Sequence, residues 1–446
     1  MPTVPAGANQ QSLAAVNGQP IAAAGHAVSA RRGSQWLSQE DLQAHLAALV
    51  RLENVGVLLG AGASMGPLGG MTMVDLWKHF SVNYPASLQW LVSEEFVYDI
   101  HALPNVEALA DTLEIARLEW IRQRRTADLV GLNQARSDLQ RAVIRAGLLD
   151  ELWWKDPASV EQSSPALDSH RALLQKLTAA RQPGQPSPWL FTTNYDLAIE
   201  WAAESIGLKV SNGFDGLHHR AFAPHNFDLG YRNVLARGEA RFGTYNIYLA
   251  KLHGSLTWRA TKDGTSYLEY PTAYVWESIS SFLTGGAEED FPGPVVFPSA
   301  AKYLQTVGFV LGELLRRLTD VLARPQTCLM TTGYSFSDEH LNRIVATALQ
   351  NPTLQLVIYL PEAERDGDSF DMTTCKPWVR RIAALASPQV TVVGGGPAAH
   401  FGEFINHLPD PVIYDEQAER IREMLKERGG LSGGIARVSG PTESSS

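Results

Sequence analysis

An amide and a carboxylate, two residues apart, follow the apolar run Trp189–Thr193. Asn194 can donate and accept hydrogen bonds, and Asp196 supplies a carboxylate. Parallel α/β sheets bind ligands at the carboxyl ends of their strands, so Thr193, Asn194 and Asp196 are candidate substrate-contacting residues, although the motif taken alone favours capping. The alternative interpretation is capping, because Asn and Asp are also common in turns and at helix starts, and a helix is expected over Asp196–Ile206.

A histidine occupies the equivalent position after a second apolar run. His253 follows Ile247–Leu252, and Gly254 leaves open space beside the imidazole. Imidazole titrates near neutral pH, which suits a general base that takes a proton from a hydroxyl group or from water. A structural histidine is the alternative, but the position at the end of a strand favours catalysis.

A glycine-rich segment follows a third apolar run. The run Val55–Leu59 leads directly into Gly60, Ala61, Gly62, Ala63 and Ser64. Glycines at such a place let backbone N–H groups approach a diphosphate closely. The fingerprint of ordinary dehydrogenases has a glycine where this chain has Met65, and the Gly-Lys-Ser/Thr of a Walker A loop does not follow. The segment fits either a nucleotide-binding loop or a tight strand-to-helix turn.

A fourth apolar run, Cys328–Thr332, ends in another glycine turn. Gly333 and Ser335 are candidates for a rim that contacts phosphate or ribose. Ser337 or Asp338 follows, and each is a suitable cap for a helix that begins near Asp338. Taken alone, this motif favours capping.

Histidines also gather in one patch, at His218, His219 and His225. Their spacing matches no familiar metal site, so we predict exposed loop histidines and no metal. The chain has two cysteines, Cys328 and Cys375, which can build neither a zinc ribbon nor a disulfide framework. This cysteine usage favours a reducing, cytoplasmic location.

The overall charge narrows the possible partners. Among 446 residues, 37 are Lys or Arg and 47 are Asp or Glu, which gives a net charge of −10. Proteins that bind nucleic acid directly have a broad basic surface, so this balance predicts no such contact. No apolar run reaches the roughly 18–20 residues that a membrane span needs.

The motifs require a framework that brings strand ends together. Strand-like and helical segments alternate, which predicts an α/β fold with a mostly parallel sheet and helices on both faces. A long helical stretch between the first two strands predicts an inserted helical subdomain at about 66–185. The strands are expected at Val55–Leu59, Trp189–Thr193, Ile247–Leu252, Val295–Phe297, Cys328–Thr332, Leu354–Leu360 and Val390–Val393.

The two ends of the chain differ in composition from the body. Residues 1–35 are rich in Ala, Gly, Pro, Ser and Gln, which predicts a disordered arm. Ser38, with Asp41 three residues later, predicts the capped start of a helix over Gln39–Glu53. The folded domain is expected over 36–410, followed at 411–446 by a C-terminal helix and a disordered tail.

Together and in this order, the four motifs resemble the sirtuin-like NAD-consuming domain of bacterial antiphage defence proteins. The run Asn105, Val106 and Glu107 also resembles an element of that family, and the likeness extends over roughly Leu52–Leu408. The resemblance implies a Rossmann-like sheet that binds NAD as substrate without a metal. It also implies Asn194 and His253 as the catalytic pair, with Asp196 near the nicotinamide side.

Two departures from the deacylating members of that family bear on the activity. This chain has no four-cysteine zinc module, and it has Thr-Asn-Tyr-Asp where they have Gln-Asn-Ile-Asp. Both departures favour an NAD glycohydrolase, which the resemblance implies to be an abortive-infection effector. The family also implies a homo-oligomer and a partner such as a HerA-like ring ATPase. The alternatives are a non-catalytic NAD or ADP-ribose sensor or structural ring subunit, and a protein ADP-ribosyltransferase or deacylase.

Overall fold

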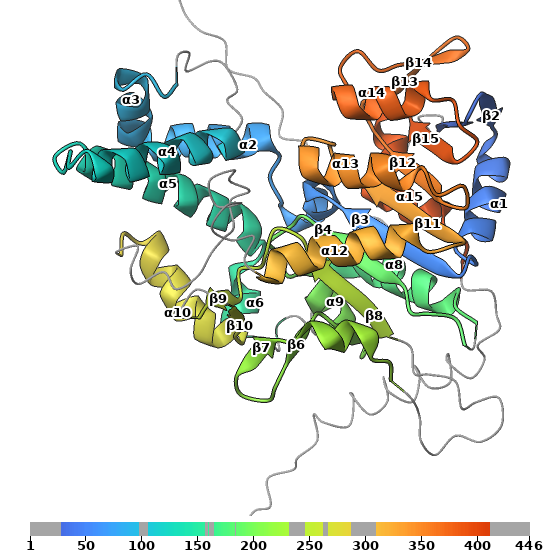
Figure 1. The fold of residues 1–446 in the computed structure, drawn as a ribbon, viewed down its shortest axis with the longest axis horizontal. Coiled ribbons are helices and arrows are strands. Elements are labelled where there is room, and N and C mark those ends of the chain that lie inside the picture. Colours follow the sequence, from blue (N-terminus) through green and yellow to red (C-terminus); the bar gives the residue numbers. More distant parts are fainter. Residues whose placement is uncertain are drawn as a thin grey trace, which may run out of the picture.

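The computed structural model describes residues 28–97, 106–156, 159, 165–182, 184–231, 246–261, 266–286 and 309–410. At its centre lies a nine-stranded sheet in the order β2-β1-β15-β12-β11-β3-β4-β8-β5 (Figure 1). Neighbours from β15 to β5 are parallel, and β1 and β2 add antiparallel pairs at one edge. The strands are β1 (Ser29–Arg32), β2 (Gln35–Leu37), β3 (Asn54–Leu59), β4 (Trp189–Thr192), β5 (Lys209–Ser211), β8 (Asn246–Lys251), β11 (Thr327–Thr332), β12 (Gln355–Tyr359) and β15 (Val390–Gly394).

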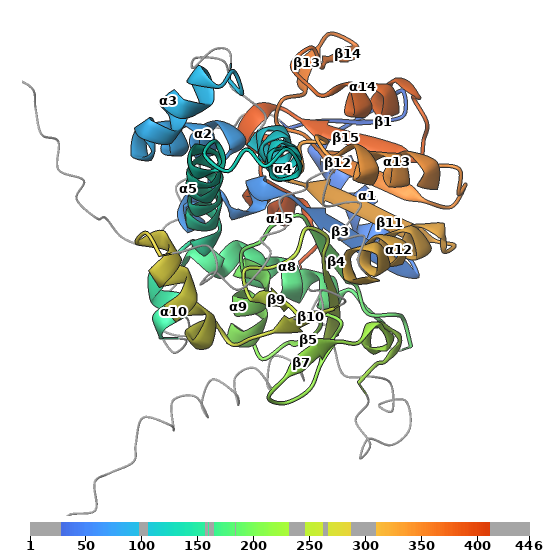
Figure 2. The same ribbon diagram turned by 60° about the vertical axis from the view of Figure 1, so that its left-hand side comes forward.

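Alternating side chains in the central strands explain why helices cover both faces of the sheet. In β4, Leu190 packs into one hydrophobic core, whereas Trp189 and Phe191 pack into the other. This arrangement confirms the predicted α/β fold, with a Rossmann-like sheet between two helical layers (Figure 2). The first core is covered by α1 (Gln39–Leu49), α8 (Asp168–Ala179), α9 (Ala198–Ser205) and α15 (Phe401–His407), and the second by α12 (Phe309–Ala323), α13 (Glu339–Ala348) and α14 (Pro377–Ala384).

The inserted helices lie beside the sheet, at the left of Figure 1. They are α2 (Met73–Asn83), α3 (Pro85–Ser93), α4 (Val106–Arg122), α5 (Leu129–Leu148) and α6 (Glu151–Lys155). Helix α5 packs against α2, α3 and α4, and α6 packs against α10 (Thr272–Leu283). The predicted insertion at 66–185 also includes α8, but α8 packs against α9 and α15 over the sheet. The inserted subdomain therefore ends before α8.

Two smaller sheets complete the described structure. One has the order β6-β7-β10-β9, and the aromatic rings of Phe214, Phe222 and Trp258 pack together in it. The other is the hairpin of β13 and β14. Their bounds are β6 (Phe214–Asp215), β7 (Arg220–Phe222), β9 (Trp258–Ala260), β10 (Tyr267–Glu269), β13 (Glu364–Asp366) and β14 (Ser369–Asp371).

The prediction of a disordered arm over residues 1–35 is wrong for its last residues, which form strands in the sheet. Residues 29–35 were expected to belong to that arm, yet Ser29–Arg32 form β1 and pair with β15. Backbone hydrogen bonds hold β1 between β15 and the edge strand β2, and a single fully buried side chain, Ala30, anchors it to the core. Residues 1–27 and 411–446 lie outside the described residues, and so do Asn105 and the strand expected at 295–297.

The other expected strands are confirmed to within one residue at each end, as β3, β4, β8, β11, β12 and β15. The predicted capping box is also confirmed: the Ser38 hydroxyl accepts from the Asp41 amide, and the Asp41 side chain accepts from the Ser38 amide. Every helix within the described ranges is too short or too polar to cross a membrane.

Candidate active site

The four motifs lie together at the carboxyl ends of the strands because β11, β3, β4 and β8 are adjacent and parallel. The Gly60–Ser64 loop follows β3, Asn194 follows β4, His253 follows β8 and Gly333 follows β11. The chain continues from β3 to β4 on one side, and β11 lies on the other. Such a reversal of strand order is where open α/β sheets bind ligands.

The glycines after β3 and β11 let two loops touch. A Cβ atom at Gly60 would lie 2.3 Å from the carbonyl oxygen of Gly333, and Gly333 itself has φ of +63°. The amide of Gly62 donates to that carbonyl at 3.0 Å, and the amide of Ala63 donates to the carbonyl of Gly60. With the Gly60 amide bonded to Thr332, at least three of the five loop amides are used within the protein, and Ala61–Ser64 also form a 3-10 helix. Any contact of this loop with a diphosphate must come from its remaining amides.

Asn194 and Asp196 are joined through a buried serine. The Nδ2 group of Asn194 donates to Ser64 Oγ at 3.0 Å, and Ser64 Oγ donates to Asp196 Oδ2 at 2.7 Å. The second carboxylate oxygen of Asp196 accepts from the amide of Ala198, at the start of α9. Asp196 therefore accepts from the first amide of α9, although the N-cap residue of that helix is Leu197, and it also holds Ser64. The amide of Asn194 instead joins the turn after β4 to the loop after β3.

The protonation of this network fixes the orientation of the Asn194 amide. A carboxylate can only accept, so the single hydroxyl proton of Ser64 is used by Asp196. Ser64 Oγ must then accept, which it does from the NH₂ group of Asn194. Within the described part of the chain, the amide oxygen of Asn194 has no hydrogen-bond donor. It can accept a hydrogen bond from a hydroxyl group or a water.

His253 has a carboxylate partner that sequence reasoning assigned only to capping. Its Nε2 atom lies 2.9 Å from Asp338 Oδ2. The other oxygen, Oδ1, accepts from the amides of His340 and Leu341, so Asp338 does cap α13. The sequence could have indicated this contact, because a carboxylate after β11 and a histidine after β8 both lie at the carboxyl ends of the parallel strands. The ring of Tyr195 lies 6.5 Å from the imidazole.

A buried lysine connects the turn after β4 to β8. Lys251, the last residue of β8, is 1% exposed. Its ammonium group donates to the backbone carbonyl of Asp196 and lies 2.9 Å from Glu200 Oε1. Burial raises the pKa of Glu200, while attraction to Lys251 lowers it. The sequence analysis assigned no role to Lys251. The pair fixes the turn that carries Asn194 against the strand that carries His253.

A buried histidine interacts electrostatically with Asp196. His170, on α8, is 3% exposed and packs against the ring of Phe401. Burial lowers its pKa to about 4, and the negative charge of Asp196 opposes that shift. Its Nδ1 atom is buried and has no hydrogen-bond partner among the residues that the structure describes. His170 is therefore neutral at physiological pH.

The remaining predicted residues contribute less to the geometry. The amide of Thr193 donates to the carbonyl of Leu59, and the exposed Ser335 hydroxyl contacts that of Ser337 at 2.9 Å. The histidines of the predicted loop patch are all exposed. Among the residues that the structure describes, no three or more His, Cys, Asp or Glu side chains are grouped to bind a metal. The exposed histidines of the loop patch are His218, His219 and His225.

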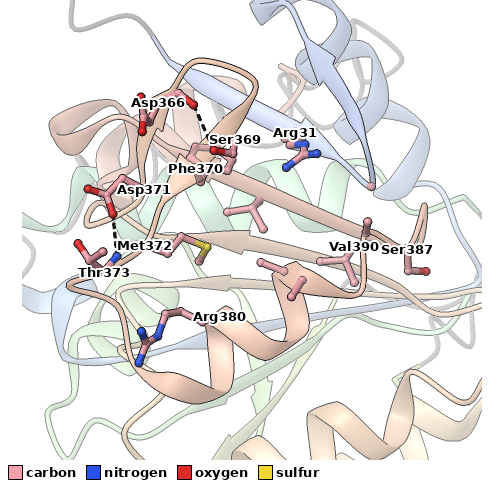
Figure 3. Close-up of a pocket in the computed structure, with 15 residues that line it drawn as sticks. Arg31, Asp366, Ser369, Phe370, Asp371, Met372, Thr373, Arg380, Ser387 and Val390 are labelled. Atoms are coloured by element: carbon pink, nitrogen blue, oxygen red, sulfur yellow. Dashed lines mark hydrogen bonds between the residues drawn. The ribbon is translucent and has the colours of Figure 1, made fainter.

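A pocket of about 450 Å³ lies elsewhere, between β1, the β13–β14 hairpin, α14 and β15 (Figure 3). Asp371, Thr373 and Arg380 lie at the left of the view, and Val390 and Ser387 lie at the right. Phe370 and Met372 contribute apolar wall between them. None of the predicted site residues lines this pocket, so it is separate from the edge where β4 and β8 end.

Comparison with known families bears on the central part of the chain. Residues 188–374 match the family model of the SIR2-like domain. This match supports a sirtuin-like family. SIR2-like domains use NAD as substrate, so the match indicates NAD-related activity. The matched residues contain the motifs after β4, β8 and β11. The Gly60–Ser64 loop precedes the matched residues in the chain but contacts one of them, Gly333. No curated protein matches the chain.

Proposed function

We propose that this protein is an NAD glycohydrolase, which cleaves NAD to nicotinamide and ADP-ribose. The observation that carries the proposal is the placement of Asn194 and His253 at the ends of adjacent parallel strands, within a SIR2-like match. An amide that positions and an imidazole that takes a proton are what hydrolysis at the ribose requires. Simple NAD binding requires neither side chain.

The proposed reaction breaks the bond between ribose C1′ and the nicotinamide nitrogen. The electron pair of that bond goes to the ring nitrogen, which neutralises the pyridinium and leaves positive charge on the ribose. A water molecule then forms the new C1′–O bond and gives up a proton to His253. The amide oxygen of Asn194 accepts a hydrogen bond from that water or from a ribose hydroxyl. Ser64 and Asp196 prevent this amide from turning.

Protein deacylation and ADP-ribosyl transfer are supported less well. The deacylating relatives in the sirtuin family carry a zinc module built from four cysteines. This chain has two cysteines, Cys328 and Cys375, and both side chains are buried. The residues that would bind that ion are therefore not present in the sequence.

From the family resemblance alone, we further propose an abortive-infection role against phage in the cytoplasm. Depletion of NAD harms the host cell, so such an activity must be held off until infection. Control through a homo-oligomer or a partner such as a HerA-like ring ATPase would meet that need. The family match on residues 188–374 is compatible with this setting.

The deciding experiment separates a catalyst from a sensor. Nicotinamide release, NAD binding by calorimetry and the melting temperature are measured for wild type and Asn194→Ala, with and without candidate partners. For a catalyst, Asn194→Ala loses most turnover but binds NAD within roughly tenfold, about 1.4 kcal/mol. For a sensor, wild type also leaves NAD intact. Asn406→Ala, which removes an exposed amide on α15, is the matched control and keeps full turnover.

A further inference from the structure

We propose that Asp338 is the positioning residue for His253, and that it makes Nδ1 the imidazole atom that takes the proton. This inference rests on the proposed NAD hydrolysis and assigns its base at the level of atoms. Asp338 does not contact substrate in this role. It acts through the 2.9 Å contact between its Oδ2 atom and His253 Nε2.

The carboxylate of Asp338 divides its two oxygens between two tasks. Oδ1 accepts from the amides of His340 at 2.8 Å and Leu341 at 3.1 Å, which fixes the side chain to the first turn of α13. Oδ2 is then directed to His253. The side chains of His253 and Asp338 are 13% and 17% exposed, so water competes little for their contact. An imidazole held in this way keeps one orientation.

The charge of Asp338 determines which ring nitrogen carries the proton. Burial raises the pKa of Asp338. Hydrogen bonds from His253 and from the amides at the start of α13 lower this pKa by more than burial raises it, so the net shift is downward. At neutral pH Asp338 is therefore an ionised carboxylate, which only accepts. Nε2 of His253 must donate, and in a neutral imidazole the other nitrogen, Nδ1, then accepts. Nδ1 makes no hydrogen bond within the described residues.

The loop before Asp338 is built to place it. Phe336 has φ of +56°, a left-handed conformation that a bulky side chain adopts only where its surroundings enforce it. Asn342, which is fully buried, supplies that enforcement: its Nδ2 donates to the carbonyl of Phe336, and its Oδ1 accepts from the hydroxyl of Tyr334. These contacts do not involve the Asp338 carboxylate, so the loop keeps its shape when that carboxylate is changed.

In the hydrolytic step, the water proton moves to Nδ1 while the Nε2 proton stays between the ring and Asp338. The new C1′–O bond forms as the electron pair of the C1′–N bond leaves with nicotinamide. His253 becomes an imidazolium, and the adjacent carboxylate stabilises that charge. The proton is later released to solvent from Nδ1, so no proton is transferred to Asp338.

The test is Asp338→Asn, which separates the two tasks. An Asn side chain caps a helix about as well as Asp, so the melting temperature stays near that of wild type. Its NH₂ group faces Nε2, which can accept that donor only if the ring proton moves to Nδ1. We expect kcat to fall roughly 10²-fold, with the KM for NAD within about threefold. Nitrogen NMR of labelled histidine should show the His253 proton on Nε2 in wild type and on Nδ1 in the variant.

Asp150→Asn is the matched control. Asp150 caps α6 by accepting from the amide of Leu152, so the same atoms change at a helix start in the inserted subdomain, and turnover stays at the wild-type value. Full turnover in Asp338→Asn, with the His253 tautomer unchanged, overturns the proposal. A rise in turnover also overturns it, because Asp338 would then restrain His253 rather than orient it. If wild type never cleaves NAD, the proposed function fails, while the tautomer measurement still decides the contact itself.

Discussion

The two halves of the candidate site place their polar groups in different ways. In the Asn194 half, which comprises Ser64, Asn194 and Asp196, the side chains bond mainly to one another, and Ser64 and Asp196 are buried. In the His253 half, which comprises His253 and Asp338, one ring nitrogen is committed and the other remains an acceptor. The first half is suited to hold a shape, and the second is suited to move a proton.

Two histidines show the same contrast. His170 adjoins the Asn194 half, and burial keeps it neutral by lowering its pKa to about 4. His253 instead has an anionic neighbour, Asp338, that stabilises a positive charge on the ring. The protein therefore has one imidazole arranged to remain uncharged and another arranged to become charged during a reaction. Lys251 connects the two halves through the carbonyl of Asp196.

The largest expected effect is the loss of the proton acceptor. His253→Ala should lower NAD cleavage by roughly 10²–10⁴-fold, the usual scale for a lost general base. Folding should survive, because the side chain makes one hydrogen bond at the edge of the sheet. Nicotinamide release and the melting temperature measure the two effects. His219→Ala, at an exposed histidine, is the control and keeps full turnover. Near-wild-type turnover in His253→Ala would remove the base from the mechanism.

Local sequence patterns predicted the strands and the sheet edge well. Buried parallel strands such as Val55–Leu59 and Cys328–Thr332 are short apolar runs followed by glycine, and both properties are visible in the sequence. The strand Ser29–Arg32 was missed because its stability comes from pairing with β15, more than three hundred residues away. A long-range backbone pairing leaves no periodic signal in the segment that makes it.

The candidate site was predicted as a set of positions and not as a network. Motif order placed Asn194 and His253 at strand ends, where the structure has them. It could not show that Ser64 links Asn194 to Asp196, or that Asp338 contacts His253. Those contacts join residues 85 to 132 positions apart, and they depend on which strands are neighbours.

The second expected effect concerns pH and the neutral histidine. His170 has a pKa of about 4 in the folded protein against 6.5 when unfolded, so the unfolded state binds more protons between these values. Stability is retained above about pH 6.5 and falls as the pH drops toward 4, by on the order of 3 kcal/mol from this residue. His170→Leu, which cannot titrate, should flatten this part of the curve by that amount. Denaturant unfolding at a series of pH values measures it.

The control for this effect is His218→Gln, because His218 is exposed and a change there should leave the slope unaltered. Other histidines with a lowered pKa also titrate, including the half-buried His45, whose pKa burial lowers to about 4, so His170→Leu should reduce the slope without abolishing it. An unchanged slope in His170→Leu would mean that His170 is hydrated or charged in the folded state. The contrast between a histidine kept neutral and a histidine arranged to become charged would then be lost.

The smallest expected effect tests whether the Asn194 half acts only through shape. Ser64→Ala removes the atom between Asn194 and Asp196, which leaves the half-buried Asn194 donor and the buried Asp196 acceptor unpaired at a cost of about 1–3 kcal/mol. The freed Asn194 amide should also lower turnover, by roughly tenfold, because it no longer holds one orientation. Ser87→Ala is the matched control. Ser87 is likewise buried and donates to a carboxylate, Asp138, at 2.6 Å within the inserted helices.

Ser87→Ala should therefore lose similar stability in denaturant unfolding while keeping NAD cleavage unchanged. The pair of variants separates destabilisation from loss of positioning, since both delete the same hydroxyl from the same kind of contact. If Ser64→Ala loses stability but cleaves NAD at the wild-type rate, the orientation of Asn194 does not limit the reaction. The Asn194 half would then be structural, and catalysis would depend on His253 and Asp338 alone.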